Sequence, residues 1–330
     1  MNTLLLNNTA NDIDHAATLL KNGGVVAVPT ETVYGLAADA SDPVAVNKIF
    51  TAKQRPNNHP LIVHIHSLAQ LEQLTVDVPQ AAFLLANAFW PGPLTMLLNK
   101  SDAVIEEVNG GLTTVGVRMP DHPVLRALLM QSDLFVAAPS ANPHKQLSPT
   151  TAQHVFNELQ GKIDAVIDGG PCNVGVESTI IDLTPLAQQQ PARILRAGPL
   201  TATMLSAVLG TPVINYQAHQ QQVPGNIAQH YQPKGKLRVA PTAELVTMCQ
   251  QWPDSTACVA YSDNLINAMH STGHGHALMP MQADKAKYAR ALYAALYDLD
   301  RQGFAHIWVE QPPQSEAWDD VNDRLSRAGA

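Results

Sequence analysis

The sequence predicts an α/β protein: a mixed central sheet covered by helices, followed by a second and smaller α/β domain. Amphipathic helical segments alternate with short buried strands over roughly the first two hundred residues, which is typical of helices that cover a sheet. Several strand-like segments follow one another without a helix between them, so a mixed sheet is expected. The chain has 330 residues, 45% of them hydrophobic, which is enough for two domains with real cores.

The first predicted helix carries apolar residues at helical spacing from Ile13 to Leu20, and Gly23 ends it. Residues 25–28 form a short apolar run, which indicates a buried strand ending at Pro29. The same succession recurs, with helices expected at 43–51, 125–130 and 150–159 and strands expected at 61–65, 134–138 and 165–167. Strands without an intervening helix are expected at 94–98, 114–119, 179–183 and 192–196.

The alternating pattern breaks after residue 209. Residues 210–236 are rich in Gln, Pro and Gly and have weak periodicity, which predicts a linker. Beyond it the pattern predicts strands at 257–261 and 306–309, a strong helix at 284–301 and a last helix near 318–327. The expected organisation is therefore a first domain over 1–209, a linker over 210–236 and a small α/β domain over 237–330.

The overall composition excludes several classes of protein. With 28 acidic and 20 basic residues the formal charge is −8, which disfavours binding of nucleic acid through a broad basic face but leaves a local basic pocket open. No apolar run approaches the ~20 residues of a membrane helix, and the first ten residues do not resemble a secretory signal. Cys172, Cys249 and Cys258 are too few and too scattered for a disulfide framework. A cytoplasmic protein is expected.

Glycine-rich phosphate loops are not expected. Gly170 and Gly175 have the glycine spacing of a P-loop, but Val176 and Glu177 stand where Lys and Ser or Thr are required. No Gly-x-Gly-x-x-Gly follows a predicted strand, so the sequence does not predict a Rossmann nucleotide site either.

Polar residues gather instead where predicted strands and helices end. Residues 29–35 follow the first strand, and ligands of open α/β sheets bind at strand ends; a plain polar turn is the alternative. Lys53 and Arg55 follow a helix and can clamp a phosphate chain, unless they only form a solvated helix terminus. Arg118 closes a strand and suits a carboxylate; a surface ion pair is the alternative.

Hydroxyl and amide side chains follow the strand predicted at 134–138. Ser140 and Asn142 come directly after it, and Ser148 lies in the next loop. His144 is near, but no Gly-x-Ser-x-Gly elbow is present, so contacts with a ligand fit better than a serine nucleophile. Strand alternation would also place His64 and His66 on one face. A zinc pair is one interpretation, but lone histidines are more often core or polar-contact residues, and no third ligand is evident.

The combination of these motifs resembles the threonylcarbamoyl-AMP synthase family, whose catalytic unit is a YrdC-type domain. The motifs are Pro29-Thr30-Glu31-Thr32-Val33-Tyr34-Gly35-Leu36, Lys53-x-Arg55-Pro56, Pro60-Leu61 with His64, Pro139-Ser140-Ala141-Asn142, Val176-Glu177-Ser178-Thr179 and Leu195-Arg196-x-Gly198. The Lys-x-Arg and Ser-x-Asn elements are specific in this order and separation, whereas any one alone is weak. The resemblance covers nearly the whole chain. It implies a YrdC-like twisted mixed sheet and a Rossmann-like C-terminal domain.

The resemblance also implies a reaction. Members of the family join L-threonine, bicarbonate and ATP into threonylcarbamoyl-adenylate and release pyrophosphate. A tRNA threonylcarbamoyl transferase complex then passes the threonylcarbamoyl group to the adenosine beside the anticodon. Mg²⁺ is expected with ATP, held mostly by phosphate and water, and no metal ligands are expected from the protein. No membrane partner is expected, and direct tRNA binding is expected to be weak or absent.

The resemblance assigns expected contacts residue by residue. L-Threonine is expected at Thr32, His64, Arg118, Ala138 and Ser178. ATP is expected at Arg55, His59, Thr114, Ser140, Asn142, Ser148, Arg196 and Tyr231, with Tyr231 folding back over the nucleotide from the linker. Lys53 and Arg55 are the expected catalytic residues. The chain departs from the family pattern at Gln54 (usually Gly), His59 (often Asn), Val223 (usually Ser) and Gln229 (usually Arg).

Elementary chemistry agrees with these assignments. The carbamate and the triphosphate of ATP are both negatively charged. Their repulsion, as the carbamate oxygen approaches the α-phosphorus, is a large part of the reaction barrier. Lys53, Arg55 and Arg196 would neutralise the phosphates, and positioning with charge stabilisation needs no protein nucleophile. The alternatives are an RNA- or nucleotide-binding module without catalysis, and a regulatory protein that binds threonine or nucleotide.

Overall fold

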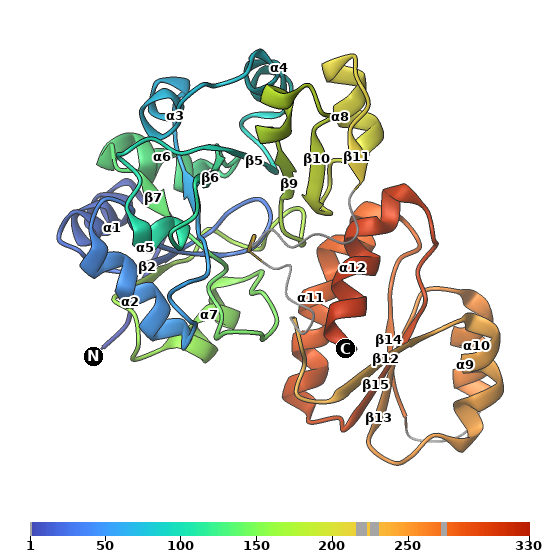
Figure 1. The fold of residues 1–330 in the computed structure, drawn as a ribbon. Coiled ribbons are helices and arrows are strands. Elements are labelled where there is room, and N and C mark those ends of the chain that lie inside the picture. Colours follow the sequence, from blue (N-terminus) through green and yellow to red (C-terminus); the bar gives the residue numbers. More distant parts are fainter. Residues whose placement is uncertain (1, 216–222, 225–230, 272–275) are drawn as a thin grey trace. The chain divides into compact units, whose positions relative to one another are not determined.

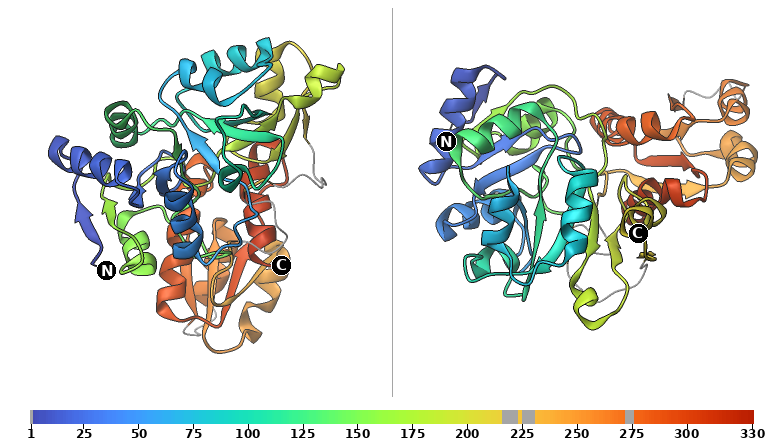
Figure 2. Two further views of the ribbon diagram at one scale, coloured as in Figure 1. Left: turned by 60° about the vertical axis from the view of Figure 1, so that its left-hand side comes forward. Right: turned by 90° about the horizontal axis from the view of Figure 1, so that it is seen from above.

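The computed structural model describes residues 2–215, 223–224, 231–271 and 276–330, and every structural statement below refers to these residues. Figure 1 shows the chain, and Figure 2 gives two further views. The chain divides into two compact units. The first comprises Met1–His144, Ser148–Asn173 and Glu177–Asn226, and the second comprises Lys145–Leu147, Val174–Val176 and Ile227–Ala330. Each unit is an α/β structure, as the sequence predicted.

The first unit is built on an 11-stranded sheet with the order β1-β8-β2-β3-β7-β4-β6-β5-β9-β10-β11. Its strands are β1 (Leu4–Leu6), β2 (Val26–Val28), β3 (Gly35–Asp39), β4 (Ile62–His64), β5 (Leu94–Asn99), β6 (Thr114–Arg118), β7 (Val136–Ala137), β8 (Ala165–Ile167), β9 (Thr179–Asp182), β10 (Arg193–Arg196) and β11 (Ile214–Asn215). The pairs β4–β6 and β5–β9 are parallel, whereas β2–β3 and β5–β6 are antiparallel. The predicted mixed sheet is confirmed.

Helices cover both faces of this sheet, and strand β2 shows why. Val26 and Val28 pack into one apolar cluster, whereas Val25 and Ala27 pack into the other, so the strand is buried on both sides. This explains the unbroken apolar run at 25–28. The helices of this unit are α1 (Ala10–Lys21), α2 (Pro43–Lys53), α3 (Leu68–Leu74), α4 (Gln80–Phe89), α5 (Glu106–Asn109), α6 (Pro123–Ser132), α7 (Ala152–Leu159) and α8 (Ala202–Leu209).

Helix α2 delivers a basic pair to the end of the sheet. Asp42 caps its first turn by accepting the Val44 N–H at 2.8 Å, and Pro43 occupies the first helical position. The helix ends at Gln54, whose φ of +52° lies in the left-handed region. That conformation suits glycine best, which accounts physically for the glycine usual at this position.

The second unit is a parallel four-stranded sheet with the order β12-β15-β13-β14. Its strands are β12 (Lys236–Ala240), β13 (Thr256–Ala260), β14 (Ala277–Pro280) and β15 (His306–Glu310), and its helices are α9 (Thr242–Met248), α10 (Asp263–Ser271), α11 (Lys285–Gln302) and α12 (Asp319–Ala328). Figure 1 shows α9 and α10 on one side of this sheet and α11 and α12 on the other. The predicted β13, β15, α11 and α12 are confirmed to within a few residues.

Buried Glu310 ties three strand ends of the second unit together. Its carboxylate accepts the Thr242 hydroxyl at 2.7 Å and the backbone N–H groups of Tyr261 at 2.7 Å and Ser262 at 2.9 Å. The three donors each come just after the end of β12 or β13, so the carboxylate satisfied by them connects these strand ends to β15. Across the described ranges no helix combines the length and apolar character that crossing a membrane requires.

Candidate functional site

A row of polar side chains crosses the middle of the large sheet in the first unit. His64 on β4 lies opposite Arg118 on β6, and Arg118 lies opposite Thr95 on β5. Residues directly opposite in neighbouring strands point to the same face of the sheet. Because all three side chains are buried, this face holds a charged and polar row inside the unit rather than at its surface.

The turn before β3 meets this row at Arg118. The Thr30 hydroxyl donates to the Val33 carbonyl at 2.6 Å and shapes the turn. Arg118 Nη2 donates to Thr32 Oγ1 at 3.0 Å and lies 2.6 Å from Glu31 Oε1. Only 5% of the Arg118 side chain is exposed, so the surface ion pair considered from the sequence is wrong: this ion pair is buried.

Arg196 and Ser178 extend the network at the other end of the row. Arg196 Nε and Nη2 donate to the Ser178 carbonyl at 3.0 and 2.9 Å, and Nη2 also donates to Ser178 Oγ at 2.9 Å. Ser178 Oγ lies 2.8 Å from Thr95 Oγ1. Gly198 is required beside them, since a Cβ there would come within 2.6 Å of the Ser178 carbonyl carbon. Hydrogen bonds thus connect Arg196 to Thr95, the neighbour of Arg118.

The Lys-x-Arg and Ser-x-Asn motifs are in direct contact. Lys53 Nζ donates to the Ser140 carbonyl and, at 2.5 Å, to the Asn142 carbonyl. Burial, followed by the neighbouring Arg55 guanidinium, holds the pKa of Lys53 well below its usual range. Lys53 therefore fixes the backbone of the Ser-x-Asn loop in this structure, and one more bond, Ala141 N–H to the Tyr34 carbonyl at 2.8 Å, ties that loop to the turn before β3.

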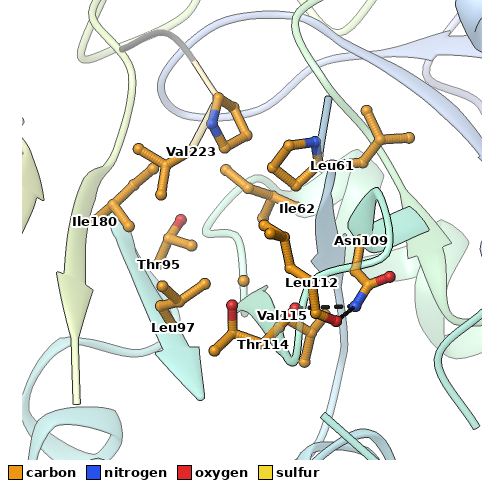
Figure 3. A pocket seen from close by; sticks show the side chains of 13 residues that line it. Leu61, Ile62, Thr95, Leu97, Asn109, Leu112, Thr114, Val115, Ile180 and Val223 are labelled. Carbon is orange, nitrogen blue, oxygen red and sulfur yellow. Dashed lines mark hydrogen bonds between the residues drawn. The ribbon is translucent and has the colours of Figure 1, made fainter. Parts of the chain in front are cut away.

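Figure 3 shows a pocket of the first unit. Two of its lining residues accept hydrogen bonds from arginines outside the lining: Arg55 Nη2 donates to the Pro60 carbonyl at 3.0 Å, and Arg196 Nη1 donates to the Pro224 carbonyl at 2.8 Å. Thr114 lines the same pocket. The other lining residues are Leu61, Ile62, Thr95, Leu97, Asn109, Leu112, Val115, Gly116, Ile180 and Val223. The walls are mostly apolar, with Thr95, Asn109 and Thr114 as the polar members. The open volume of about 10 Å³ is that of about one water molecule, so a nucleotide ring would require these walls to move apart.

Val223 belongs to an apolar cluster of this unit. It is buried against Ile62, Leu97, Ile180 and Leu195. The departure from the usual serine at this position therefore places a hydrophobic anchor where Pro224 reaches Arg196. The expected linker over 210–236 is not wholly separate from the sheet, since Ile214–Asn215 pairs with β10.

The remaining predicted residues of the first unit lie beside these groups. Ser148 donates to buried Glu177 at 2.5 Å. The His59 and His144 rings meet edge to face at 5.6 Å between centroids, and burial together with Arg55 lowers the pKa of His59. Ala138 follows β7 and donates its N–H to the Ile62 carbonyl at 3.1 Å.

Tyr231 is the predicted contact that belongs to the second unit. Its buried ring lies 5.8 Å from the Tyr293 ring, and the Arg324 guanidinium lies 5.2 Å above it. Its neighbours Gln229 and His230 lie outside the described residues. The predicted fold of Tyr231 over a nucleotide stays a prediction.

The zinc pair considered from the sequence is wrong in its geometry. Strand β4 ends at His64, and His66 lies beyond it, 2.9 Å from Asp133. Among the residues that the structure describes, no group of three or more His, Cys, Asp or Glu side chains is arranged to hold a metal ion.

Sequence reasoning missed two members of the network, Glu31 and Thr95. Glu31 stood within a noted motif, but the motif gave it no role. Thr95 joins the site through the register of β5 against β6 and through its contact with Ser178, and a single sequence carries no signal for either.

Neutral His64 makes stability depend on pH. Burial, and then the Arg118 charge, lowers the pKa of His64 to about 3, whereas the unfolded value is near 6.5. Below pH 6.5 the unfolded chain binds the proton first, so stability is lost as pH falls from about 6.5 toward 3, by up to about 1.4 kcal/mol per pH unit. Urea unfolding between pH 7.5 and 5 should show a steeper loss in the wild type than in His64→Gln. Equal slopes would contradict a neutral buried His64.

Comparisons with known proteins agree with this architecture. A family model named for Sua5, YciO and YrdC and described as "Telomere recombination" matches residues 18–198. A second, described as "Threonylcarbamoyl-AMP synthase, C-terminal domain", matches residues 200–330. The threonylcarbamoyl-AMP synthase of Schizosaccharomyces pombe is 34% identical over 98% of this chain and 89% of its own length.

Two further relatives align over a shorter region. The threonylcarbamoyl-AMP synthases of Pyrococcus abyssi and Bacillus subtilis are 45% and 46% identical over 68% and 69% of this chain, and each alignment spans 66% of the relative. The crystal structure of P. abyssi Sua5 complexed with L-threonine superposes with a TM-score of 0.88 at 35% identity, covering 99% of this chain and 98% of that chain. The resemblance inferred from the motifs is confirmed. The chain belongs to the Sua5-type threonylcarbamoyl-AMP synthases, a family of enzymes.

Proposed function

We propose that this protein forms threonylcarbamoyl-AMP and pyrophosphate from L-threonine, bicarbonate and ATP, for the threonylcarbamoyl modification of tRNA adenosine. The observation that carries the proposal is the buried polar row of the first unit. Hydrogen bonds join Arg196 to Ser178 and Ser178 to Thr95, and Thr95 lies opposite Arg118 in the sheet. Arg118 is suited to a carboxylate and Arg196 to phosphates. The L-threonine complex of the P. abyssi relative supports a threonine site in this fold.

The threonine end would be formed by Arg118, Thr32, His64, Ala138 and Ser178. Arg118 Nε is buried and has no hydrogen-bond partner among the described residues, so it is available to a carboxylate. The same holds for Nδ1 of neutral His64, which suits a hydroxyl. Since the Thr30 hydroxyl proton goes to Val33, Thr32 donates to Thr30 and its oxygen is left to accept, from Arg118 and from a substrate N–H.

The ATP end would lie where Arg55, Thr114 and Arg196 border the pocket of Figure 3. Lys53 would hold Ser140 and Asn142 in place for the phosphates, and Ser148 and His59 would complete the contacts. Mg²⁺ would accompany ATP, bound by phosphate oxygens and water. Tyr231 would contact the nucleotide from the linker.

The chemistry then needs no protein nucleophile. The threonine amine and bicarbonate give a carbamate and water; the carbamate oxygen displaces pyrophosphate from the α-phosphorus, and the new P–O bond completes the mixed anhydride. Arg55 and Arg196 lower the repulsion between the two anions and stabilise the charge on the leaving pyrophosphate. Burial of the network keeps water from the labile carbamate.

The wider setting is part of the proposal. The catalytic domain would span 1–209, with a linker over 210–236 and the small domain over 237–330. The protein would act in the cytoplasm and hand its product to a tRNA threonylcarbamoyl transferase complex. With a net charge of −8, direct tRNA binding would be weak.

Pyrophosphate release tests the proposal. Purified protein with Mg²⁺ and all three substrates should release pyrophosphate and incorporate labelled bicarbonate into a threonine–AMP adduct, and omission of any substrate should abolish the adduct. Absence of both products would contradict the proposed reaction. RNA affinity that falls steeply with salt, without any turnover, would favour the alternative binding module.

A further inference from the structure

We propose that Glu31 is a positioning residue: it fixes the Arg118 guanidinium in the orientation that receives the carboxylate of the amino-acid substrate. The inference rests on the proposed function and deepens it. Glu31 is not among the residues expected to contact threonine or ATP. Glu31 Oε1 lies 2.6 Å from Arg118 Nη2, and 8% and 5% of the two side chains are exposed.

Both carboxylate oxygens of Glu31 are held by β6 and the residues after it. Oε1 meets Arg118 at the end of the strand, and Oε2 accepts the Asp121 N–H at 3.1 Å. One oxygen is therefore in an ion pair with Arg118 Nη2, and the other accepts the Asp121 N–H. A carboxylate supplies both oxygens, whereas the amide of a glutamine supplies one acceptor and places an N–H group opposite the other donor.

These contacts leave one edge of Arg118 available. Its Nη2 is engaged by Glu31 and by Thr32 Oγ1 at 3.0 Å, while its Nε is buried without a hydrogen-bond partner among the described residues. An arginine side chain has four rotatable bonds, so a guanidinium held at Nη2 presents Nε in a defined direction. A carboxylate is the ligand that matches such a fixed donor.

Two effects of Glu31 on the substrate oppose each other. Its negative charge repels an incoming carboxylate, and its ion pair orients the group that binds that carboxylate. We expect orientation to dominate, because the buried Arg118 guanidinium, without Glu31, must turn toward another acceptor. Loss of Glu31 should then weaken the binding of threonine rather than strengthen it.

The kinetic test uses Glu31→Gln. The KM for L-threonine should rise at least tenfold, the KM for ATP should stay within twofold, and kcat should stay within threefold. Selectivity for L-threonine over the competitor L-threoninol, which lacks the carboxylate, should fall. An unchanged or lower threonine KM, or a rise in selectivity, would overturn the proposal.

Two comparisons separate positioning from a general structural effect. In an Arg118→Lys background Glu31→Gln should change the threonine KM by less than twofold, since the group that it orients is gone; additive effects would overturn the proposal. Asp182→Asn is the matched control, because Asp182 is also a buried acid paired with an arginine, Arg193, at 2.8 Å. It should lower stability and leave the threonine KM unchanged.

A measurement on the wild type keeps the proposal testable if Glu31→Gln does not fold. In ¹⁵N–¹H spectra, assigned with Arg118→Lys, the Nη groups of Arg118 should show slow rotation about Cζ–Nη before threonine is added. If the Nη signals of Arg118 are averaged in the free protein and become separate only when threonine is added, the guanidinium is not held by Glu31. That result would contradict the proposal. Turnover by the wild type tests the reaction itself, so failure of the two proposals is distinguishable.

Discussion

Replacing Arg55 by alanine is expected to lower turnover by about 10³-fold while the protein stays folded. One arginine that stabilises the charge on a transferring or leaving phosphate contributes on this order. Arg55 is half-buried and donates to the Pro60 carbonyl at the rim of the pocket, so its loss removes a positive charge from the nucleotide end of the site without opening the core. Initial rates of pyrophosphate release measure the effect.

Two control variants define what the Arg55→Ala result means. Arg126→Ala removes the same charge from an exposed position, where the side chain is 3.8 Å from Asp121, and should leave the rate unchanged. Arg55→Lys keeps the charge but loses the planar fork, and should recover only part of the rate. Normal turnover in Arg55→Ala would remove Arg55 from the proposed phosphate site.

Replacing Lys53 by methionine is expected to reduce both stability and turnover. Its ammonium bonds the Ser140 and Asn142 carbonyls, and each buried carbonyl left without a donor costs about 1–3 kcal/mol. Relief from burying the ammonium offsets part of this cost, so a net loss of about 2 kcal/mol is expected. Turnover should fall about 10²-fold, since a displacement near 1 Å of groups that position substrate has that effect.

Lys48→Met is the matched control, because Lys48 lies on the same helix and donates to one carbonyl, that of Gly23, at 2.6 Å from an exposed position. Urea unfolding should show no change beyond about 0.5 kcal/mol, as for other surface substitutions. A Lys53→Met protein with wild-type stability would show that Lys53 does not hold the Ser-x-Asn loop. One with reduced stability but full turnover would separate the loop from the reaction.

The sequence predicted elements where a single principle dominated. Helix α1 and strand β2 followed from apolar spacing and from burial on both faces. Strand β3 was missed because four of the five residues of Gly35–Asp39 are Gly, Ala or Asp, which strands disfavour, and only its position between β2 and β7 makes it one. Strand β12 was missed because Lys236–Ala240 mixes charged and apolar residues at a sheet edge.

For the site, too, the residues within local motifs were predicted, whereas contacts between distant segments were not. The Lys-x-Arg and Ser-x-Asn motifs were found from their sequence, and their contact through Lys53 Nζ fits the pairing. The ion pair of Glu31 with Arg118 joins residues 87 positions apart and depends on how the turn before β3 meets β6, which no local pattern encodes. From the sequence, Lys53 was expected to neutralise phosphates. In the structure it is buried and donates to the Ser140 and Asn142 carbonyls.

A crystal structure with L-threonine and a non-hydrolysable ATP analogue tests most directly whether one site in the first unit holds both substrates. We expect the threonine carboxylate on Arg118 and the phosphates between Arg55 and Arg196, with Glu31 still paired to Arg118. Either ligand bound elsewhere, or phosphates that contact neither arginine, would contradict this expectation.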